Sequence, residues 1–518
     1  MKNNILWVDD EIELLESHII YLKDKNYNVL TANSGEDAIE LCKESKIDLI
    51  LLDEMMTGID GIATLKIIKN DYPDIPVIMV TKNEEEDFME EAIAEKISYY
   101  LTKPVNPSQI LMACKKLLEN SKIENNKLIK DFLEYVNEVQ NYNFDEMDYN
   151  NWKKIYTEFS NWSLKIEEIN NLSFIEILND QKKLLNKKFT NYVINNYQNW
   201  IKNVDSRPLL SNELFKRKFE PIIDKKQLII IVIDCFRYDQ WLQISPILKE
   251  LFTIKEDLHM SILPTATPFA RNAIFSGLLP QEIKSKKYNL WKKMFIDGKY
   301  NKYEKELFEE ALKDNNKNSK SFHYEKIINV NEGKKFYNKL NDYKNIDILS
   351  IVVNFVDILG HSRSESQILK ELIPNESAYR LAVHNWFKNS WLKDCLIELS
   401  NWDADILITS DHGNTMVSKA VEVKADSSAS LGVRYKYGRN LNFSDKDVLK
   451  IKTPENYGLP SFDVNTEYLI SGDNKYFVYS NQFHKYSNLL KNSFQHGGIS
   501  LDEVLVPLIH LRNKNEWF

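Results

Sequence analysis

Short apolar runs separated by amphipathic stretches mark the first 120 residues of this chain. The runs ILWV, LILL and IPVIMV alternate with segments such as ESHIIYLKDKNY, whose apolar positions recur at helical spacing. Strands that alternate with helices in this way form parallel βαβ units. The pattern therefore predicts a parallel α/β domain over residues 1–120.

Longer apolar runs occur in the second half of the chain, and each contains an aspartate at or near its end. LIIIVID ends at Asp234, ILSIVVNFVD ends at Asp357, and DILITSDHG contains Asp411. Strands of a doubly wound sheet end on one edge, where ligands bind, so we expect the three acids to converge. Taken alone, an Asp after a strand is usually a helix N-cap, and that interpretation stays open for Asp234.

Three histidines accompany these acids. His361 follows Asp357 in DILGH, His412 follows Asp411 in SDHG, and His496 lies in QHGG. A lone histidine is more often packed or solvated, but the joint pattern argues against coincidence. Mixed carboxylates and imidazoles suit zinc or manganese better than a cage of oxygens alone would.

A hydroxyl nucleophile is available in LPTATPFARN, at Thr267 or at Thr265. A threonine hydroxyl needs activation by a base or a metal, and zinc lowers the pKa of a bound oxygen. Both threonines also fit a turn or an N-cap before a helix that begins near Pro268. The two roles are compatible, because a helix N-terminus also favours phosphate. Arg271 and Asn272 follow on this helix as candidate phosphate contacts.

The middle of the chain has a different character. Residues 123–203 contain neither glycine nor proline, and apolar residues such as Trp152, Ile155, Tyr156 and Phe159 fall at helical spacing. This predicts a helical bundle over residues 121–205, after which SRPLLSNELF leads into a third domain over residues 206–518. An α/β protein of three domains suits a length of 518 residues.

Composition restricts the partners and the cellular location that we expect for this protein. The net charge of −9 argues against a protein that coats nucleic acid, although a local basic groove is compatible with it. No segment has a helix-turn-helix with a basic recognition helix, so direct binding to promoter DNA is disfavoured. The four cysteines show no paired spacing, which favours free thiols in a reducing cytosol. Without a signal peptide or a membrane-length apolar run, we expect a cytoplasmic protein that does not enter membranes.

One further segment bears on the substrate. In GVRYKYGRNL, a strand would place Arg434 and Lys436 on one face and Tyr435 and Tyr437 on the other. Basic and aromatic side chains together suit an oligonucleotide, whose phosphates and bases they can contact. An exposed amphipathic edge strand is the alternative interpretation.

The C-terminal motifs together resemble the alkaline phosphatase superfamily, and within it the PglZ type. The matching stretches are IVIDCFRYDQW, LPTATPFARNAIFSGLLP, NFVDILGH, TSDHG and QHGG. The resemblance implies two zinc ions and a zinc-dependent phosphodiesterase whose nucleophile is the second Thr of the PTxT stretch, Thr267. One ion would be held by Asp357, His361 and His496, and the other by Asp234, Asp411, His412 and Thr267. A phosphomonoesterase or a sulfatase is a rival, and sulfatase is the weaker because its nucleophile derives from Cys or Ser.

Residues 1–120 resemble a receiver domain of two-component systems, which has a flavodoxin-like fold. The resemblance makes Asp53 the phosphoacceptor and gives Thr81, Tyr100 and Lys103 the roles of switch residues. Thr57 and Lys82 depart from residues common in that family without removing its chemistry. The resemblance also implies a Mg²⁺ ion held by Asp9, Asp10, Asp53 and Met55.

The order of the three domains resembles the PorX-type response regulators. This implies a sensor histidine kinase of the PorY type, an extracytoplasmic-function sigma factor as partner, and control of type IX secretion and gliding. It also implies hydrolysis of cyclic or linear oligonucleotides, and we expect a homodimer on phosphorylation of Asp53. The alternative is a non-catalytic regulator whose metal-bound domain senses a nucleotide or binds the sigma factor.

Overall fold

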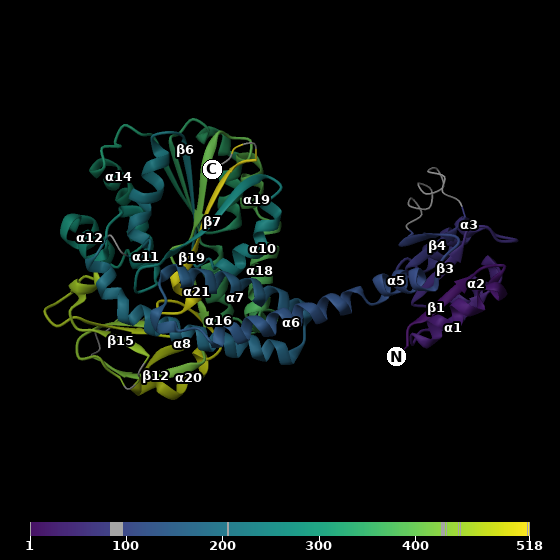
Figure 1. Cartoon of the computed structure of the whole chain (residues 1–518). Coiled ribbons are helices and arrows are strands. Elements are labelled where there is room, and N and C mark those ends of the chain that lie inside the picture. Colours follow the sequence, from purple (N-terminus) through teal and green to yellow (C-terminus); the bar gives the residue numbers. More distant parts are fainter. Residues whose placement is uncertain are drawn as a thin grey trace. The chain divides into compact units, whose positions relative to one another are not determined.

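The protein consists of two compact units, residues Met1–Gln140 and Asn141–Phe518 (Figure 1). The structure is a computed structural model that describes residues 2–82, 97–204, 207–425, 430, 432–443, 445, 447–514 and 516, with the main chain alone at 120–123 and 482. Within the described residues, no helix is both long enough and apolar enough to span a bilayer. The two units are described separately below.

The N-terminal unit is built on a five-stranded sheet in the order β2-β1-β3-β4-β5. All neighbouring strands are parallel, which confirms the predicted fold. One apolar cluster packs α1 and α5 against one face, and a second packs α2 and α3 against the other. The elements are β1 (Asn4–Val8), α1 (Glu16–Asp24), β2 (Asn28–Ala32), α2 (Gly35–Glu44), β3 (Leu49–Asp53), α3 (Gly61–Asp71), β4 (Val77–Thr81), β5 (Tyr99–Thr102), α5 (Pro107–Leu118) and α6 (Asn120–Gln140).

The C-terminal unit contains a six-stranded sheet in the order β7-β19-β10-β6-β9-β8. Strands β10, β6, β9 and β8 are parallel, while β19 and β7 run antiparallel along one edge. The three apolar runs of the sequence form its centre and are buried. The strands are β6 (Gln227–Ile233), β7 (Phe252–Met260), β8 (Phe322–Ile327), β9 (Ile348–Val353), β10 (Ala404–Thr409) and β19 (Leu505–Asn513).

Helices cover this sheet, with α11 and α14 on one side and α10, α18 and α19 on the other (Figure 1). The longer helices pair with one another through buried apolar faces, as α11 does with α14 and α10 with α18. The helices are α9 (Glu220–Ile223), α10 (Tyr238–Leu248), α11 (Thr267–Ser276), α12 (Pro280–Lys286), α13 (Tyr288–Trp291), α14 (Glu304–Asp314), α15 (Val330–Asn338), α16 (Phe355–Glu365), α17 (Gln367–Leu372), α18 (Glu376–Lys388), α19 (Trp391–Leu399), α20 (Phe483–Leu490) and α21 (Leu501–Val504).

Three small sheets follow β10 in the sequence, and they order the chain between the motifs TSDHG and QHGG. The first pairs β11 (Thr415–Met416) with β18 (Phe494–Gln495) next to both motifs. The second contains β12 (Lys419–Lys424), β14 (Asn442–Phe443) and β17 (Lys475–Tyr479). The third contains β13 (Tyr435–Gly438), β15 (Val448–Ile451) and β16 (Glu467–Ser471).

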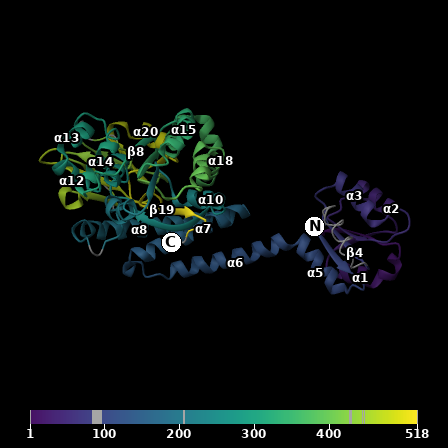
Figure 2. The ribbon, with the colours of Figure 1, turned by 90° about the horizontal axis from the view of Figure 1, so that it is seen from above.

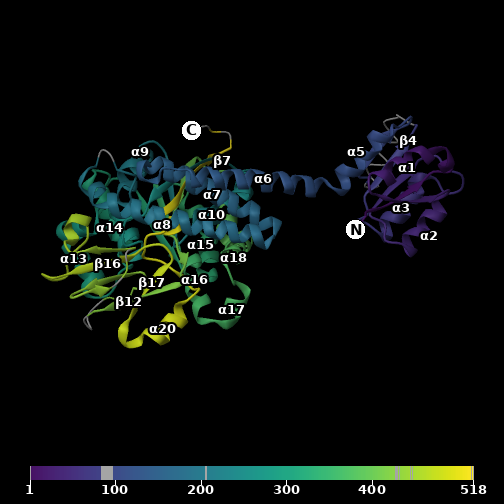
Figure 3. The same ribbon diagram turned by 60° about the horizontal axis from the view of Figure 1, so that its bottom comes forward.

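Two long helices of the middle region, α7 (Tyr149–Ile169) and α8 (Leu172–Lys202), belong to the C-terminal unit. They pack on each other, and α7 also packs on α10 while α8 packs on α21 (Figures 2 and 3). The predicted helices are therefore present. Helix α6 belongs to the N-terminal unit, which ends at Gln140. The predicted domain boundary at 120/121 stays a prediction. The predicted boundary at 205/206 lies outside the described residues.

Candidate metal centre

The first group of candidate ligands lies at the ends of β6 and β10. Asp234, Asp411 and His412 are buried, and each offers an atom within 4.8 Å of the other two. The Thr267 hydroxyl, at the start of α11, lies 3.0 Å from His412 Nε2 and 3.4 Å from Asp234 Oδ1. Parallel strand ends have thus brought residues about 180 positions apart to one point, as the pattern predicts.

The orientation of His412 suits a ligand. Its Nδ1 lies 3.1 Å from the carbonyl oxygen of Gly413, and a carbonyl oxygen can only accept a hydrogen bond. Nδ1 therefore carries the proton in the neutral ring, and Nε2 keeps its lone pair towards Asp234 and Thr267. Such a hydrogen bond from the second ring nitrogen commonly fixes the tautomer of a metal-binding histidine.

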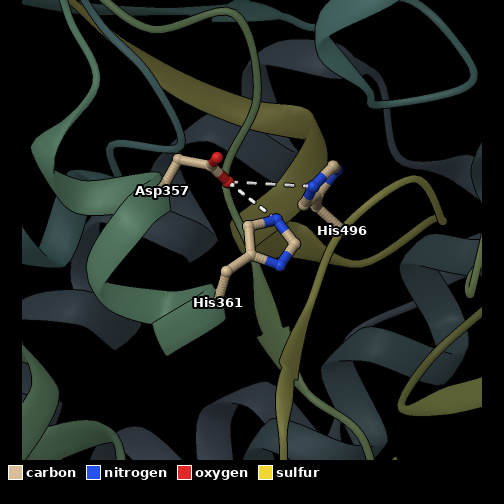
Figure 4. Close-up of side chains that lie close together, drawn as sticks. All are labelled: Asp357, His361 and His496. Atoms are coloured by element: carbon tan, nitrogen blue, oxygen red, sulfur yellow. Dashed lines mark ion pairs between the residues drawn. The ribbon is translucent and has the colours of Figure 1, made fainter. Parts of the chain in front are cut away.

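The second group contains Asp357, His361 and His496, which also offer atoms within 4.8 Å of one another. Figure 4 shows the imidazoles of His361 and His496 both facing the same oxygen of the Asp357 carboxylate. Its Oδ1 lies 3.3 Å from His361 Nε2 and 3.8 Å from His496 Nε2. The two groups adjoin, because the rings of His412 and His496 are stacked with centroids 4.3 Å apart.

Asp357 does not lie at the end of a strand, as the apolar run predicted. The apolar run does not reach it as a strand: β9 ends at Val353, and Asp357 lies in the first turn of α16. The run continues because Val356 of the helix is also buried. Asp357 and His361 are therefore four residues apart on one helix, a spacing that places both on the same face.

The candidate ligands differ in the direction in which their surroundings shift the pKa. Burial, reinforced by Asp234, raises the pKa of Asp411 well above its usual range. Burial would also raise the pKa of Asp357, but the hydrogen bond with His361 and the charges of nearby histidines outweigh it, so that pKa is lowered. Burial lowers the pKa of His496 to about 4, so at neutral pH its ring keeps the lone pair that a metal requires.

The residues present fit metal ions. Asp411 Oδ2 and His496 Nδ1 are buried without a hydrogen-bond partner among the described residues. Unpartnered buried polar atoms are costly, and a buried carboxylate beside a second one needs positive charge. Carboxylates, imidazoles and a hydroxyl in groups of three to four match the ligand numbers of zinc.

The two threonines of LPTATP face different partners. The Thr265 hydroxyl donates to the Gly498 carbonyl oxygen at 2.7 Å and accepts from the Gly497 amide at 3.2 Å. It thus holds the loop after His496, whereas Thr267 faces the first ligand group. Neither caps α11, because the N-cap is Ala266; the helix begins at Thr267, one residue before the expected start.

Arg271 and Asn272 do not have the expected phosphate-facing position. Arg271 is fully buried: Nη1 donates to Asp234 Oδ2 at 2.7 Å, and Nε donates to Glu304 Oε1 at 2.6 Å. Asn272 is also fully buried and donates to the carbonyl oxygens of Pro268 and Tyr300. On the second turn of α11 both side chains point into the packed interior, and Arg271 orients a candidate ligand.

Arg434 and Lys436 also differ from the expectation. Arg434 directly precedes β13, is 0% exposed and forms two 2.7 Å hydrogen bonds with Glu503. Lys436, within β13, is 3% exposed and lies over the Tyr479 ring. Neither is free for a substrate phosphate. Tyr435, on the other face, packs against Phe269 with ring centroids 5.8 Å apart.

Three partner residues were not identified from the sequence. Asn354 donates to Asp234 Oδ2 at 2.7 Å, Glu304 accepts from Arg271, and Glu503 accepts from the Gly498 amide at 2.9 Å. Glu503 carries a usable signal, because a charged pair in SLDEVLVPLI interrupts an otherwise apolar stretch. Glu304 lies in a charged helix and gives no comparable signal.

The receiver has its own acidic site. Asp9, Asp10 and Asp53 offer oxygens within 4.8 Å of one another, and Lys103 Nζ lies 2.8 Å from Asp9 and 2.9 Å from Asp53. Burial is the largest influence on Asp53 and raises its pKa, with Lys103 opposing it. Met55 is 70% exposed on an adjacent pocket of about 700 Å³, and its carbonyl is the group that suits Mg²⁺.

Of the three predicted switch residues, Lys103 pairs with Asp53, whereas Thr81 and Tyr100 have other surroundings. The Thr81 hydroxyl donates to the carboxylate of Glu54. Tyr100 lies on β5 with 44% of its surface exposed.

Comparisons with known proteins identify the families that the chain resembles. Family models match three successive segments: the response regulator receiver domain at residues 5–115, the PorX response regulator linker domain at 122–201, and the BREX system PglZ alkaline phosphatase-like domain at 214–511. The last covers more than half of the chain. These segments define a response regulator joined to an alkaline phosphatase-like domain. The chain belongs to the PglZ family, and its domain order is that of a PorX-type response regulator.

Curated relatives cover the receiver. The heme response regulator HssR of Staphylococcus haemolyticus is 34% identical over 125 residues, which are 24% of this chain and 55% of HssR. HssR of Staphylococcus aureus (strain MRSA252) is 32% identical over 121 residues, 23% of this chain and 54% of that protein. The chain thus spans about half the length of these relatives. Among solved structures, Vibrio cholerae CheY4 is 27% identical with a TM-score of 0.22, covering 23% of this chain and 100% of CheY4.

Proposed function

We propose that the C-terminal domain is a zinc-dependent phosphodiesterase with Thr267 as its nucleophile, controlled by phosphorylation of Asp53. The observation that carries the proposal is the position of the Thr267 hydroxyl. It lies at the start of α11 and within 3.4 Å of two residues of a metal-binding group. A hydroxyl so placed is beside its activating groups and beside helix amides that favour a phosphoryl group.

The ligand assignment is the one that the grouping supports. Zinc bound here would supply positive charge that activates a hydroxyl and neutralises charge on phosphate. One ion would lie among Asp357, His361 and His496, and the other among Asp234, Asp411, His412 and Thr267. His412 keeps its Nε2 lone pair through the Gly413 contact, and Arg271 and Asn354 both hold Oδ2 of Asp234.

The ion pairs of the arginines Arg271 and Arg434 support a diester substrate. A phosphomonoester carries an extra negative charge that a monoesterase must offset. Arg271 is committed to Asp234 and Glu304, and Arg434 is committed to Glu503. Both guanidinium charges are already offset by carboxylates, so neither adds positive charge for a second phosphate charge, and a diester does not need one.

The receiver supports control by a sensor histidine kinase, for which PorY-type kinases are the expected class. Mg²⁺ at Asp9, Asp10, Asp53 and the Met55 carbonyl would complete its acidic site. On phosphorylation of Asp53, Thr81 and Tyr100 would turn inwards and a symmetric homodimer would form. The match to the PorX linker domain supports an extracytoplasmic-function sigma factor as partner and type IX secretion and gliding as output.

The decisive experiment compares a phosphodiester, a phosphomonoester and a short oligonucleotide as substrates of the zinc-loaded chain. Thr267→Ala should lower diester turnover by more than about 10³-fold while two zinc ions still bind, and Thr267→Ser should keep a measurable rate. Undiminished turnover by Thr267→Ala would exclude this nucleophile. Faster turnover of the monoester would identify a phosphatase, and binding of the oligonucleotide without hydrolysis would favour the non-catalytic regulator.

A further inference from the structure

Helix α8 contacts the segment that follows the HGG motif through three residues of one face. Thr190 donates its hydroxyl to the Ile499 carbonyl oxygen at 3.0 Å, and the Asn186 side-chain oxygen accepts from the Leu501 amide at 2.9 Å. Lys182 Nζ lies 2.7 Å from Asp502 Oδ2. The three residues are four apart, so they form a single line along the helix. Thr190 and Asn186 are buried, and the side chain of Lys182 is 18% exposed.

The segment held by α8 in turn holds both loops of the candidate metal centre. The Glu503 carboxylate accepts from the Gly498 amide at 2.9 Å, two residues after His496. The Glu503 carbonyl oxygen accepts from the Gly413 amide at 3.2 Å, one residue after His412. A Cβ at Gly413 would lie 1.9 Å from the Asp502 carbonyl oxygen, so this approach leaves no room for a side chain.

Helices α7 and α18 add further contacts around Lys182 and Asp502. The Tyr156 hydroxyl donates to Asp502 Oδ1 at 2.9 Å. Lys182 also pairs with Glu376. Arg380 Nη1 donates to Asp239 at 2.7 Å and its Nη2 pairs with Glu167. These buried charges have one another as partners, so the position of each side chain depends on both middle-region helices and on α18.

We propose that α8 helps to position the metal ligands. Its residues Lys182, Asn186 and Thr190 hold the segment Ile499–Glu503, and this segment in turn holds the loops that contain His412 and His496. These are positioning residues, because none of them contacts a candidate ligand directly. The inference rests on the metal-binding role proposed above, and it gives the middle-region helices a direct influence on metal affinity.

The physical reason is that Glu503 is hydrogen-bonded to the main chain of both histidine loops, at Gly413 and at Gly498. Gly413, Gly497 and Gly498 contribute no side chains, so the loops are held mainly through their main-chain groups. Among the described residues, loss of the Lys182 cation would leave Asp502 with only the Tyr156 hydroxyl and Glu376 with only Arg237 at 3.6 Å. The under-compensated charge of Asp502 would then favour a shift of α21. Residues that orient metal ligands from behind typically change metal affinity about 10–100-fold.

The test measures Co²⁺ and Zn²⁺ affinity, together with the visible absorption spectrum of bound Co²⁺, for the full chain. Lys182→Met should weaken metal binding by about 10–100-fold and alter the Co²⁺ spectrum. Lys183→Met is the matched control on the next position of α8: its side chain is 64% exposed and pairs with Asp180. It should stay within about twofold of the unsubstituted chain.

Thr190→Val and Asn186→Leu decide the question if Lys182→Met does not fold, because both keep the size of the side chain and remove its hydrogen bond. Folding is checked by circular dichroism in each case. Unchanged affinity and an unchanged Co²⁺ spectrum in the folded variants would overturn the inference while leaving the zinc site itself intact. An unsubstituted chain that binds no metal would overturn both. A chain that binds metal without hydrolysing diesters would contradict only the proposed activity.

Discussion

The clearest quantitative test of the centre is removal of the Arg271 guanidinium. This side chain is fully buried, lies 2.7 Å from Asp234 and 2.6 Å from Glu304, and approaches Asp411 at 3.7 Å. Arg271→Met keeps much of the volume and removes the charge. Without metal ions, three buried carboxylates would then lose their shared cation. Removing one partner of a buried ion pair costs about 3–5 kcal/mol, and we expect a loss in that range for the metal-free protein.

Metal ions should reduce this cost. Divalent cations at the first ligand group would compensate Asp234 and Asp411 directly. Glu304 would still accept from Tyr324 at 2.6 Å and lie 3.4 Å from Lys326 Nζ. The remaining loss in the zinc-loaded protein should then approach that of one hydrogen bond to a charged group, about 1.5–3 kcal/mol. Zinc should therefore stabilise Arg271→Met more than it stabilises the unsubstituted chain.

Urea unfolding with EDTA and with zinc, followed by tryptophan fluorescence, measures both losses. Arg439→Met is the control, because Arg439 is 53% exposed and pairs with Asp463 at the surface; its removal should cost less than about 1 kcal/mol in either condition. Equal losses for Arg271→Met with and without zinc would refute the argument that metal and guanidinium share the same carboxylates. A loss below that of the control would refute the buried-pair reasoning altogether.

Three further predictions address other parts of the chain. Burial lowers the pKa of His259 to about 4. Between about pH 6.5 and 4 the unfolded chain therefore binds a proton that the folded chain does not, and the free energy of unfolding falls as the pH falls. In urea unfolding, His259→Gln should reduce this pH dependence by up to about 1.4 kcal/mol per pH unit. Gly413→Ala should destabilise by about 1–3 kcal/mol and weaken zinc binding, because its Cβ would overlap Asp502, as measured by unfolding and metal titration. Lys103→Met should make the thermal stability of the receiver depend more strongly on Mg²⁺, because the variant loses the cation nearest Asp9 and Asp53.

The sequence was sufficient to predict the parallel strands of both sheets and the convergence of Asp234 and Asp411. This succeeded because apolar runs identify buried strands, and parallel strands bring their ends to one edge. The same reasoning misplaced Asp357, since the apolar residues of a helix that covers a sheet extend the apolar run of the preceding strand. Periodicity alone does not mark that transition, although Asn354 at the start of α16 lies just after it.

The sequence did not reveal which face of a short strand is buried. Alternation in RYKY placed the arginine and lysine opposite the tyrosines, but it could not show that Glu503, distant in the sequence, would pair with Arg434 in the interior. Arg271 was misassigned for a similar reason. Its role depends on Glu304, whose position on α14 is set by tertiary packing and has no local signal. Charged residues in the core are therefore where sequence reasoning failed most often.

The contacts of α8 have a practical consequence for dividing this protein into parts. The PglZ match begins at residue 214, and a fragment cut there would appear to hold every candidate zinc ligand. It would lack the helix that supports the chain after His496, and it would uncover the buried face of α10 that α7 packs against. Studies of an isolated PglZ fragment should therefore start near residue 141, where the compact unit itself begins.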